Sequence, residues 1–451
     1  MKPFTLREAL EAMEGRYFGD PARLGDAVTL VTSDSRQVVG GALFIALKGA
    51  RVDGHSFMKA CLEKGAAACV TERVPADGET PAILVDSTVA ATGRLAAWYR
   101  SGFSIPVIGI TGSVGKTTTK EMISAVLAER YRTHKTQKNL NNELGVPWTL
   151  LQMEPRHQVS VVEMGISSFG EMRRLTRMVR PDIAVFTLIG DAHLEFLGDR
   201  EGVLRAKSEI FEGMGPQGLA ILNGDDPLQA TCAAEMRRVT YGLSKGCDVR
   251  GEAVRNLGEA GMACTVRHAK GTFELRIPAF GSHLVSAALA ASAVGLALGL
   301  TDEEIARGIT RFQTVGDRAR VIHTPAITMI ADCYNANPNS CRAAVDSLMG
   351  LEGKRKVCIL GDMLELGDQT RALHSDVGAY AARSGADLVV GCGPLAADIC
   401  RGAEAAGAQV RYYPEKAALM EEIDALLLPG DCVLIKASRG MAFEDIVRHF
   451  A

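Results

Sequence analysis

The stretch from Pro106 to Lys120 constrains the fold of this chain more than any other part of its sequence. An apolar run of strand length leads into a glycine-rich turn, TGSVGKT, and then into the start of a helix. Backbone N–H groups of such a turn can surround phosphate oxygens, which side chains at Gly112 or Gly115 would crowd. The positive end of the helix dipole adds to this attraction. The stretch therefore predicts an α/β fold that binds a nucleoside triphosphate at this junction.

The spacing of this loop differs by one residue from the common GxxxxGK[ST] pattern, because Ile110 stands five positions before Gly115. We expect Lys116 to reach the β- and γ-phosphates and the Thr117 hydroxyl to bind Mg²⁺. An ordinary glycine-rich turn is the alternative, but strand, turn and helix follow one another in the required order. The predicted phosphate-binding residues are Gly112, Ser113, Val114, Gly115, Lys116, Thr117 and Thr118.

The length and composition of the chain limit the classes of protein to consider. With 451 residues, the chain is expected to form two to four domains. Its 47% hydrophobic and 23% charged residues are typical of a globular protein, and its net charge of −3 gives no sign of nucleic acid as a partner. The first residues carry charges throughout and lack an apolar signal core, so we expect a cytoplasmic protein.

Two further features argue against a membrane or disulfide-bonded protein. The uncharged run from Leu284 to Leu300 is rich in Ala and Gly and shorter than the roughly 20 residues that span a bilayer, so we expect a packed helix and no membrane insertion. The eleven cysteines contain no C-x-x-C pair, which favours reduced, mostly buried thiols over a zinc site.

Alternating strand and helix patterns divide the chain into three predicted α/β domains. Residues 1–103 form a small N-terminal α/β domain, and residues 104–317 form a central doubly wound parallel sheet. Residues 318–451 form a second, Rossmann-like sheet without a phosphate loop of its own. Between about 245 and 280, short strands and glycine turns predict an antiparallel excursion, and a linker is expected near 315–321.

Two polar residues follow strands of the central sheet, where ligands of such folds bind. Glu163 ends the run VSVVE, and His193 follows the run that ends at Ile189. Carboxylate oxygen is a ligand that Mg²⁺ prefers, so we expect Glu163 to bind metal together with Thr117. The alternatives are that Glu163 caps the next turn and that His193 is structural.

Lys207 shares a predicted helix face with apolar residues such as Val203 and Ile210, so it should point inward. A buried ammonium is costly unless it is paired or neutralised. One solution is an ion pair with Glu163 or with a phosphate. Another is reaction with CO₂ to a carbamate, which would turn Lys207 into an oxygen ligand for metal.

A polar patch in the N-terminal domain, Ser33-Asp34-Ser35-Arg36, follows a predicted strand. It offers hydroxyls, backbone donors and a guanidinium to an anionic ligand. A solvated loop is the alternative interpretation.

Taken in order, the motifs TGSVGKT, VVEMG, DAHLEFLG and RAKSEIF resemble those of the Mur ligases of peptidoglycan synthesis. The resemblance extends from SDSRQVVGGALFIALKGARVDGH near the start to KASRGMAFEDIV near the end. NLNNELGVPWTLL, ADCYNANPNS and ILGDMLELGD resemble more narrowly the members that add D-alanyl-D-alanine to a UDP-N-acetylmuramoyl tripeptide.

The resemblance implies three domains: a UDP-binding one, a central phosphate-loop ATPase and a Rossmann-like one. It implies that Thr117, Glu163, His193 and carbamylated Lys207 serve two Mg²⁺ sites, with Lys116, Glu163, His193 and Lys207 as the catalytic set. It also implies that Ser33, Asp34, Ser35 and Arg36 hold the UDP end, that Asn139 and Asn141 hold the sugar side, and that Lys436, Ser438 and Arg439 lie near the incoming amine. His283, Arg318, Asp332 and Asn335 would contact the nucleotide.

The implied reaction is ATP-dependent amide formation through an acyl phosphate, in a cytoplasmic bacterial enzyme that acts as a monomer on small-molecule substrates. The family commonly opens its Ala-rich helix with His-Asn-x-x-Asn, whereas this chain has His283-Leu284-Val285-Ser286-Ala287 and keeps only the histidine. The identity of the third tripeptide residue, diaminopimelate or lysine, stays open.

Three alternatives are considered. A sister ligase that adds a single diamino acid would use an Asp-Asn-Pro-Arg stretch, and this chain has GDMLELGD instead. A folylpolyglutamate synthetase would lack the UDP-type N-terminal domain. A non-catalytic nucleotide switch would need a guanine-reading Asn-Lys-x-Asp motif, which the sequence lacks.

Overall fold

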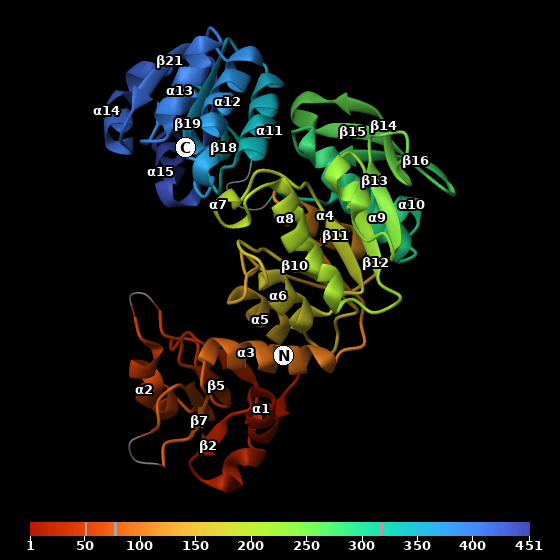
Figure 1. Ribbon diagram of the computed structural model, residues 1–451, viewed down its shortest axis with the longest axis vertical. Coiled ribbons are helices and arrows are strands. Elements are labelled where there is room, and N and C mark those ends of the chain that lie inside the picture. Colours follow the sequence, from red (N-terminus) through yellow and green to blue (C-terminus); the bar gives the residue numbers. More distant parts are fainter. Residues whose placement is uncertain (50–51, 76–78, 315–318) are drawn as a thin grey trace.

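The computed structural model describes residues 1–49, 52–75, 79–314 and 319–451. Three large sheets follow one another along the chain, each with its own helices (Figure 1). We call the parts around them the N-terminal unit (residues 1–103), the central unit (104–314) and the C-terminal unit (319–451). The mixed α/β architecture with largely parallel sheets confirms the predicted fold class. The predicted boundary between residues 317 and 318 lies outside the described residues.

The N-terminal unit has a five-stranded sheet in the order β2-β7-β6-β5-β4 and a short antiparallel pair, β1 with β3. Its strands are β1 (Phe4–Thr5), β2 (Arg16–Phe18), β3 (Ala27–Val28), β4 (Leu30–Thr32), β5 (Ala42–Ile45), β6 (Ala68–Thr71) and β7 (Ala82–Leu84). Its helices are α1 (Leu6–Met13), α2 (Met58–Glu63) and α3 (Thr88–Ser101). A 3₁₀ turn over Gly54–Phe57, capped by the Asp53 side chain, leads directly into α2.

The central unit carries a nine-stranded sheet in the order β16-β15-β14-β13-β12-β11-β8-β10-β9. Its strands are β8 (Val107–Thr111), β9 (Thr133–Lys135), β10 (Val159–Glu163), β11 (Ile183–Phe186), β12 (Leu219–Asn223), β13 (Arg237–Gly242), β14 (Val249–Asn256), β15 (Met262–His268) and β16 (Gly271–Ile277). Its helices are α4 (Lys116–Leu127), α5 (Gly145–Leu151), α6 (Glu171–Val179), α7 (Leu194–Leu197), α8 (Arg200–Ser208), α9 (His283–Ala297) and α10 (Asp302–Thr310).

In the sheet order, every neighbouring pair from β9 through β10, β8, β11, β12 and β13 to β14 is parallel. The pairs β14 with β15 and β15 with β16 are antiparallel. The antiparallel excursion predicted for residues 245–280 is therefore confirmed, and it extends the same sheet. Successive side chains of β8 point to opposite faces, as the period of a strand requires. Val107 belongs to one apolar core, and Ile108 and Ile110 belong to another that is packed with α4, α9 and α10. Helices thus cover both faces of the central sheet.

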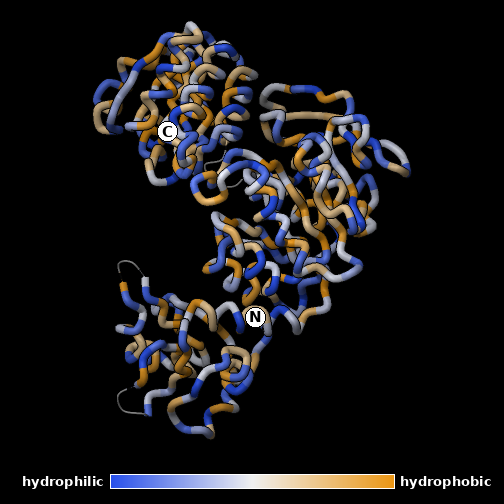
Figure 2. Tube along the Cα trace, viewed as in Figure 1, coloured by the Kyte–Doolittle hydropathy of each residue, from blue (hydrophilic) through white to orange (hydrophobic). Residues whose placement is uncertain are grey.

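The C-terminal unit has a six-stranded sheet in the order β17-β18-β22-β19-β20-β21. Its strands are β17 (Arg320–His323), β18 (Thr328–Asp332), β19 (Arg355–Gly361), β20 (Leu388–Cys392), β21 (Gln409–Tyr413) and β22 (Asp431–Lys436). Its helices are α11 (Pro338–Met349), α12 (Thr370–Arg383), α13 (Ala396–Ala405), α14 (Lys416–Leu426) and α15 (Glu444–Phe450). All pairs are parallel except that of β17 with β18, so an antiparallel edge strand begins inside the stretch predicted as a linker. In Figure 2 the hydrophobic segments of this unit gather towards its interior.

The run predicted as a packed helix forms α9, and most of its side chains are buried. None of the helices formed by the described residues combines the length and apolar character that crossing a membrane requires. All eleven cysteines are free, and all but Cys247 are buried, as predicted.

The N-terminal and central units share one apolar core. The same cluster of buried side chains includes Leu6 and Leu95 from the first unit and Leu175 and Val203 from the second. Helix α3 leads from one unit to the other (Figure 1), and Tyr99 near its end donates a hydrogen bond to the carbonyl of Met153 (2.6 Å).

Candidate nucleotide and metal site

The phosphate-binding loop predicted from the sequence connects β8 to α4. Gly112 has a φ of +144°, and a Cβ there would lie 1.9 Å from the hydroxyl oxygen of Thr187. Gly115 has a φ of +86° and is the N-cap residue of α4. Both glycines are therefore required by backbone conformation, and Gly112 also by close approach.

Hydrogen bonds fix this loop to the segment that follows β11. The backbone N–H of Ser113 donates to the carbonyl of Leu188 (2.7 Å), and its hydroxyl donates to the carbonyl of Gly190 (3.0 Å). The Thr187 hydroxyl donates to the carbonyl of Val114 (2.6 Å). The Lys116 ammonium lies over the loop and donates to the carbonyl of Gly112 (2.6 Å). The loop is thus held in shape by the protein itself.

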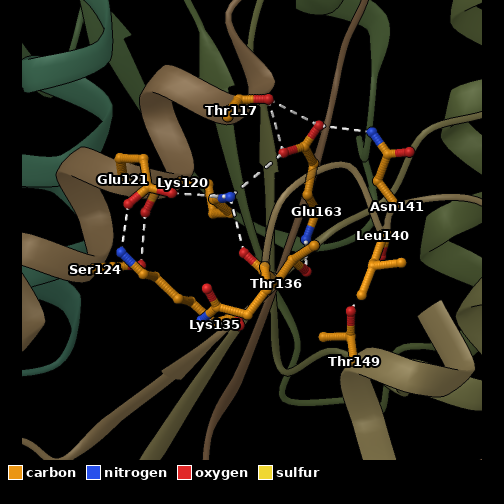
Figure 3. A network of polar contacts seen from close by, with 11 residues as sticks. Thr117, Lys120, Glu121, Ser124, Lys135, Thr136, Leu140, Asn141, Thr149 and Glu163 are labelled. Atoms are coloured by element: carbon orange, nitrogen blue, oxygen red, sulfur yellow. Dashed lines mark hydrogen bonds and ion pairs between the residues drawn. The ribbon is translucent and has the colours of Figure 1, made fainter. Parts of the chain in front are cut away.

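Glu163, the last residue of β10, lies beside the loop and is almost completely buried (Figure 3). The Thr117 hydroxyl is 3.1 and 2.9 Å from its two carboxylate oxygens, and the Asn141 amide donates to one of them (2.8 Å). The backbone N–H of Glu163 donates to the Thr136 hydroxyl (3.0 Å). Thr117 and Glu163, predicted as metal ligands, are therefore neighbours, and Asn141 holds Glu163 directly.

A buried lysine that the sequence analysis did not single out completes this network. The Lys120 ammonium donates to the carbonyl of Thr136 (2.8 Å) and forms ion pairs with Glu121 (2.9 Å) and Glu163 (3.9 Å) (Figure 3). Lys135 pairs with the same Glu121. Lys120 lies one helical turn after Lys116, and this local spacing was the only available signal for it.

Lys207, on α8, is buried as predicted. Burial first, and then the nearby Lys116 charge, lower its pKa well below the usual range, whereas Glu171 opposes the shift. The ion pair with Glu163 considered from the sequence is wrong, because Lys120 occupies that position. No described residue accepts a hydrogen bond from the Lys207 ammonium or forms an ion pair with it. Burial and the Lys116 charge thus disfavour the charged form of Lys207.

His193 precedes α7 in the left-handed conformation, with φ 57°. Burial lowers its pKa, as do the charges of Lys207 and Lys116, and Glu365 raises it. Its Nδ1 atom lies 2.5 Å from a carboxylate oxygen of Glu365 in the C-terminal unit. The charges of Lys116 and Lys207 therefore both influence the His193 imidazole.

A cavity of about 540 Å³ opens between the central and C-terminal units. Of the residues predicted from the sequence, it is lined by Ser113, Val114, Gly115, Lys116, Thr117, Thr118, Asn141, Glu163, His193, His283, Asp332, Asn335 and Lys436. Its described lining also includes Phe280, Leu284 and Phe312, which the sequence analysis did not assign to a site. The structure therefore brings most of the predicted nucleotide and metal residues to one place.

The C-terminal side of this cavity is built around Lys436, at the end of β22. Its buried ammonium pairs with Asp332 (2.5 Å) and donates to the carbonyl of Asn335 (2.8 Å). His283, on the central side, has a buried Nδ1 with no hydrogen-bond partner among the described residues. Burial is the main cause of its lowered pKa.

Other predicted residues lie outside this lining. Ser438 accepts a hydrogen bond from the backbone N–H of Leu364 (3.1 Å), and the Arg439 guanidinium lies 5.4 Å from the ring centre of Tyr334, which does line the cavity. Asn139 lies in the loop before α5 and is exposed. Arg318 lies outside the described residues.

The Ser33–Arg36 patch lies in the N-terminal unit, and no described lining residue of the cavity precedes Ser113. Arg36 pairs with Asp34 through two contacts of 2.8 and 2.7 Å, which lower the pKa of Asp34 to about 2. Thr32 accepts a hydrogen bond from the backbone N–H of Asp34 (3.0 Å). The patch is therefore an ordered turn with an exposed guanidinium.

The donor set fits Mg²⁺ bound together with phosphate. Among the described residues, no three His, Cys, Asp or Glu side chains converge as a complete metal cage. A hydroxyl and a carboxylate at the end of a phosphate loop are instead the one or two protein ligands that Mg²⁺ takes when phosphates and water supply the rest.

The phosphate loop, the buried carboxylate beside its threonine and the second sheet across the cavity define the class of this protein. It is a nucleotide-binding α/β protein whose site lies between two units. Residues 27–98 match the description "Mur ligase family, catalytic domain", 110–295 match "Mur ligase middle domain" and 310–439 match "Mur ligase, glutamate ligase domain". The chain belongs to the Mur ligase family.

Relatives match over nearly the whole chain. The UDP-N-acetylmuramoyl-tripeptide–D-alanyl-D-alanine ligase of Bacillus subtilis is 40% identical, covering 98% of this chain and 97% of that protein. The crystal structure of MurF from Acinetobacter baumannii has a TM-score of 0.91 at 32% identity, covering 100% of this chain and 99% of that one. MurF ligase from Thermotoga maritima, solved in complex with ADP, has a TM-score of 0.83 at 28% identity, covering 94% and 97%.

Proposed function

We propose that this protein is an ATP-dependent ligase that joins D-alanyl-D-alanine to a UDP-N-acetylmuramoyl tripeptide. The observation that carries the proposal is the 540 Å³ cavity in which the phosphate loop and Glu163 face Asp332 and Lys436 of the C-terminal unit. A ligase needs such a site, because its nucleotide and its two substrates must meet away from water. The full-length similarity to ligases of this name supports the choice of substrates.

The chemistry follows from the reactants. A carboxylate and an ammonium ion do not condense at neutral pH, because oxide is a poor leaving group. Transfer of the γ-phosphoryl group of ATP to the tripeptide carboxylate gives an acyl phosphate, and the neutral amine of the dipeptide then displaces phosphate. Positioning and charge neutralisation supply most of the catalysis in the first step. The amides of Gly112–Thr118 and the ammonium of Lys116 would bind the phosphates.

Thr117, Glu163, His193 and Lys207 would hold Mg²⁺ in two sites. Bound Mg²⁺ would neutralise charge on the phosphates and on the carboxylate that they approach. The lowered pKa of Lys207 supports a carbamate there, since only a neutral amine reacts with CO₂. The carbamate would replace the buried ammonium of Lys207 with an anionic oxygen ligand. It would thus remove the repulsion between that ammonium and the proposed Mg²⁺.

The remaining predicted residues would contact the nucleotide, the dipeptide or the UDP-tripeptide. His283, Arg318, Asp332 and Asn335 would contact the nucleotide, whereas Lys436, Ser438 and Arg439 would lie near the incoming dipeptide. Ser33–Arg36, Asn139 and Asn141 would hold the UDP-tripeptide, and the Arg36 guanidinium, which pairs with Asp34, is exposed there. We expect a cytoplasmic monomer.

A coupled assay tests this proposal. ADP and phosphate should appear only when UDP-tripeptide and D-alanyl-D-alanine are both present, and the product should have the summed mass of the two substrates minus water. Single diamino acids should not replace the dipeptide. Rapid ATP turnover with neither substrate, or ligation of a diamino acid instead, would overturn it. Parallel assays with diaminopimelate- and lysine-containing tripeptides would identify the third residue.

A further inference from the structure

The C-terminal unit contacts the metal-site histidine directly. Glu365, in the loop between β19 and α12, places a carboxylate oxygen 2.5 Å from Nδ1 of His193. The backbone carbonyl of the same glutamate accepts a hydrogen bond from the N–H of Glu195 (3.3 Å). Helix α7 lies beside the C-terminal unit in Figure 1, at this contact.

At this contact the backbones of the two units approach so closely that side-chain size is restricted. Gly367, two residues after Glu365, has a φ of +57°, and a Cβ there would lie 3.1 Å from the Cα of Glu195. A second segment of the C-terminal unit contacts the stretch of the central unit just before His193. There the side-chain oxygen of Asn339 accepts a hydrogen bond from the N–H of Asp191 (2.9 Å). A Cβ on Gly190 would lie 2.4 Å from the Asn339 side-chain oxygen.

The contact at His193 has a chemical consequence that the contact at Asn339 lacks. An ionised carboxylate only accepts hydrogen bonds, so the ring nitrogen that faces Glu365 must carry the proton. In a neutral ring with its proton on Nδ1, the other nitrogen, Nε2, keeps the lone pair through which an imidazole binds metal. A carboxylate on the outer nitrogen also raises the basicity of a metal-binding histidine.

We propose that Glu365 is a positioning residue for His193: supplied by the C-terminal unit, it fixes the tautomer and ring orientation in which His193 binds the divalent cation. The proposal rests on the metal role of His193 in the proposed function. It means that the metal site in the central unit acquires a fully oriented histidine only when the C-terminal unit is docked. Docking and cation binding therefore strengthen each other.

A double-mutant cycle separates this role from simple docking. Mn²⁺ binding to the enzyme–ADP complex is measured by the loss of the free Mn²⁺ electron paramagnetic resonance signal, without turnover. We expect Glu365→Ala to weaken Mn²⁺ binding roughly tenfold and Glu365→Gln, which keeps an acceptor without its charge, to weaken it less. In the His193→Ala background, Glu365→Ala should cause no further loss.

Asn339→Ala is the matched variant, because it removes the other docking contact and does not touch His193. It should weaken Mn²⁺ binding less than Glu365→Ala, and its effect should persist in the His193→Ala background. Equal effects of Asn339→Ala and Glu365→Ala, or a further tenfold loss on adding Glu365→Ala to His193→Ala, would overturn the proposal in favour of docking alone. Glu421→Gln, at an exposed position on α14, should change nothing.

The tautomer is read independently from ¹⁵N-labelled histidine by NMR, with the His193 signals assigned by their absence in His193→Ala. The wild-type ring should carry its proton on Nδ1, and Glu365→Ala should shift the population towards Nε2. A wild-type proton on Nε2 would overturn the proposal. Failure of wild-type protein with ADP to bind Mn²⁺ at all would instead overturn the metal role on which it rests.

Discussion

The Thr117 hydroxyl lies within hydrogen-bond distance of both carboxylate oxygens of Glu163, at 3.1 and 2.9 Å. One residue comes from the start of the phosphate-loop helix and the other from the end of the neighbouring strand. A hydroxyl and a buried carboxylate in this arrangement offer a cation two oxygen ligands on adjacent elements.

Thr117→Val keeps the shape of this side chain and removes its hydroxyl. We expect the Mg²⁺ concentration for half-maximal ligase activity to rise roughly 10- to 100-fold, since a proposed oxygen ligand and the hydroxyl that contacts Glu163 are lost together. Thr117→Ser should restore most of the wild-type dependence. An unchanged Mg²⁺ dependence in Thr117→Val would remove Thr117 from the metal site.

Gly112→Ala should abolish binding of ATP analogues. An alanine there combines a φ of +144° with a Cβ 1.9 Å from the Thr187 hydroxyl oxygen, so the loop must deform. The strain should lower the free energy of unfolding by about 1–3 kcal/mol, measured by urea denaturation. Gly215→Ala is the control, because its Cβ would meet no atom within 4 Å. Wild-type nucleotide affinity in Gly112→Ala would contradict the loop geometry.

Lys120→Met should destabilise the central unit. It leaves Glu121 and Glu163 without the ammonium that pairs with both, and breaking a buried pair in this way costs about 3–5 kcal/mol. Chemical denaturation measures the loss, with Lys59→Met, at an exposed position on α2, as the control. Equal stability of Lys120→Met and wild type would mean that Lys120 does not hold these carboxylates.

Lys207→Ala should reduce ligase activity by roughly 100-fold or more, since the group proposed to help stabilise the developing charge is lost. Short carboxylates added to the assay should restore part of the activity by occupying the place of the proposed carbamate. Lys207→Arg should be equally inactive and should not be rescued, because its guanidinium stays charged and fills the space. Full activity of Lys207→Ala without additive would exclude Lys207 from the site.

His134 is a buried residue of β9, and its ring lies beside that of His157. Its titration makes the free energy of unfolding depend on pH. Burial, and then the His157 charge, lower its pKa from 6.5 to about 4. Between these values the unfolded chain binds a proton that the folded chain does not, so the free energy of unfolding falls as pH drops from about 6.5 towards 4. The expected loss from pH 7 to pH 4 is roughly 3 kcal/mol for this group.

His134→Gln should lack this contribution, so the pH dependence of its unfolding free energy should be flatter than that of wild type over the same range. Denaturation series for both proteins at several pH values provide the measurement. Parallel curves would show that His134 titrates alike in the folded and unfolded chains.

The sequence alone was sufficient to predict the features of the site that depend on a local pattern of residues. The strand, turn and helix around Gly112 could be predicted because they are contiguous, and the inward position of Lys207 followed from the apolar spacing on its own helix. Glu163 was expected at the site because parallel strands end at the same edge of a sheet.

Contacts between distant segments could not be predicted in this way. Glu163 pairs with Lys120 because β9, β10 and α4 pack together, and no pattern near either residue specifies that packing. The approach of Glu365 to His193 depends on how the C-terminal unit sits on the central one. Strand β17 was missed because an edge strand of four residues, only partly buried, has little apolar periodicity.

The apolar core shared by the N-terminal and central units also predicts how the molecule denatures. Rotation of these units against each other would expose apolar surface at about 25 cal/mol per Å², so they should behave as one rigid body and melt together. The C-terminal unit has cores made almost entirely of its own residues. Heating should therefore give two calorimetric transitions rather than three, and ATP analogues that bridge the cavity should draw them together.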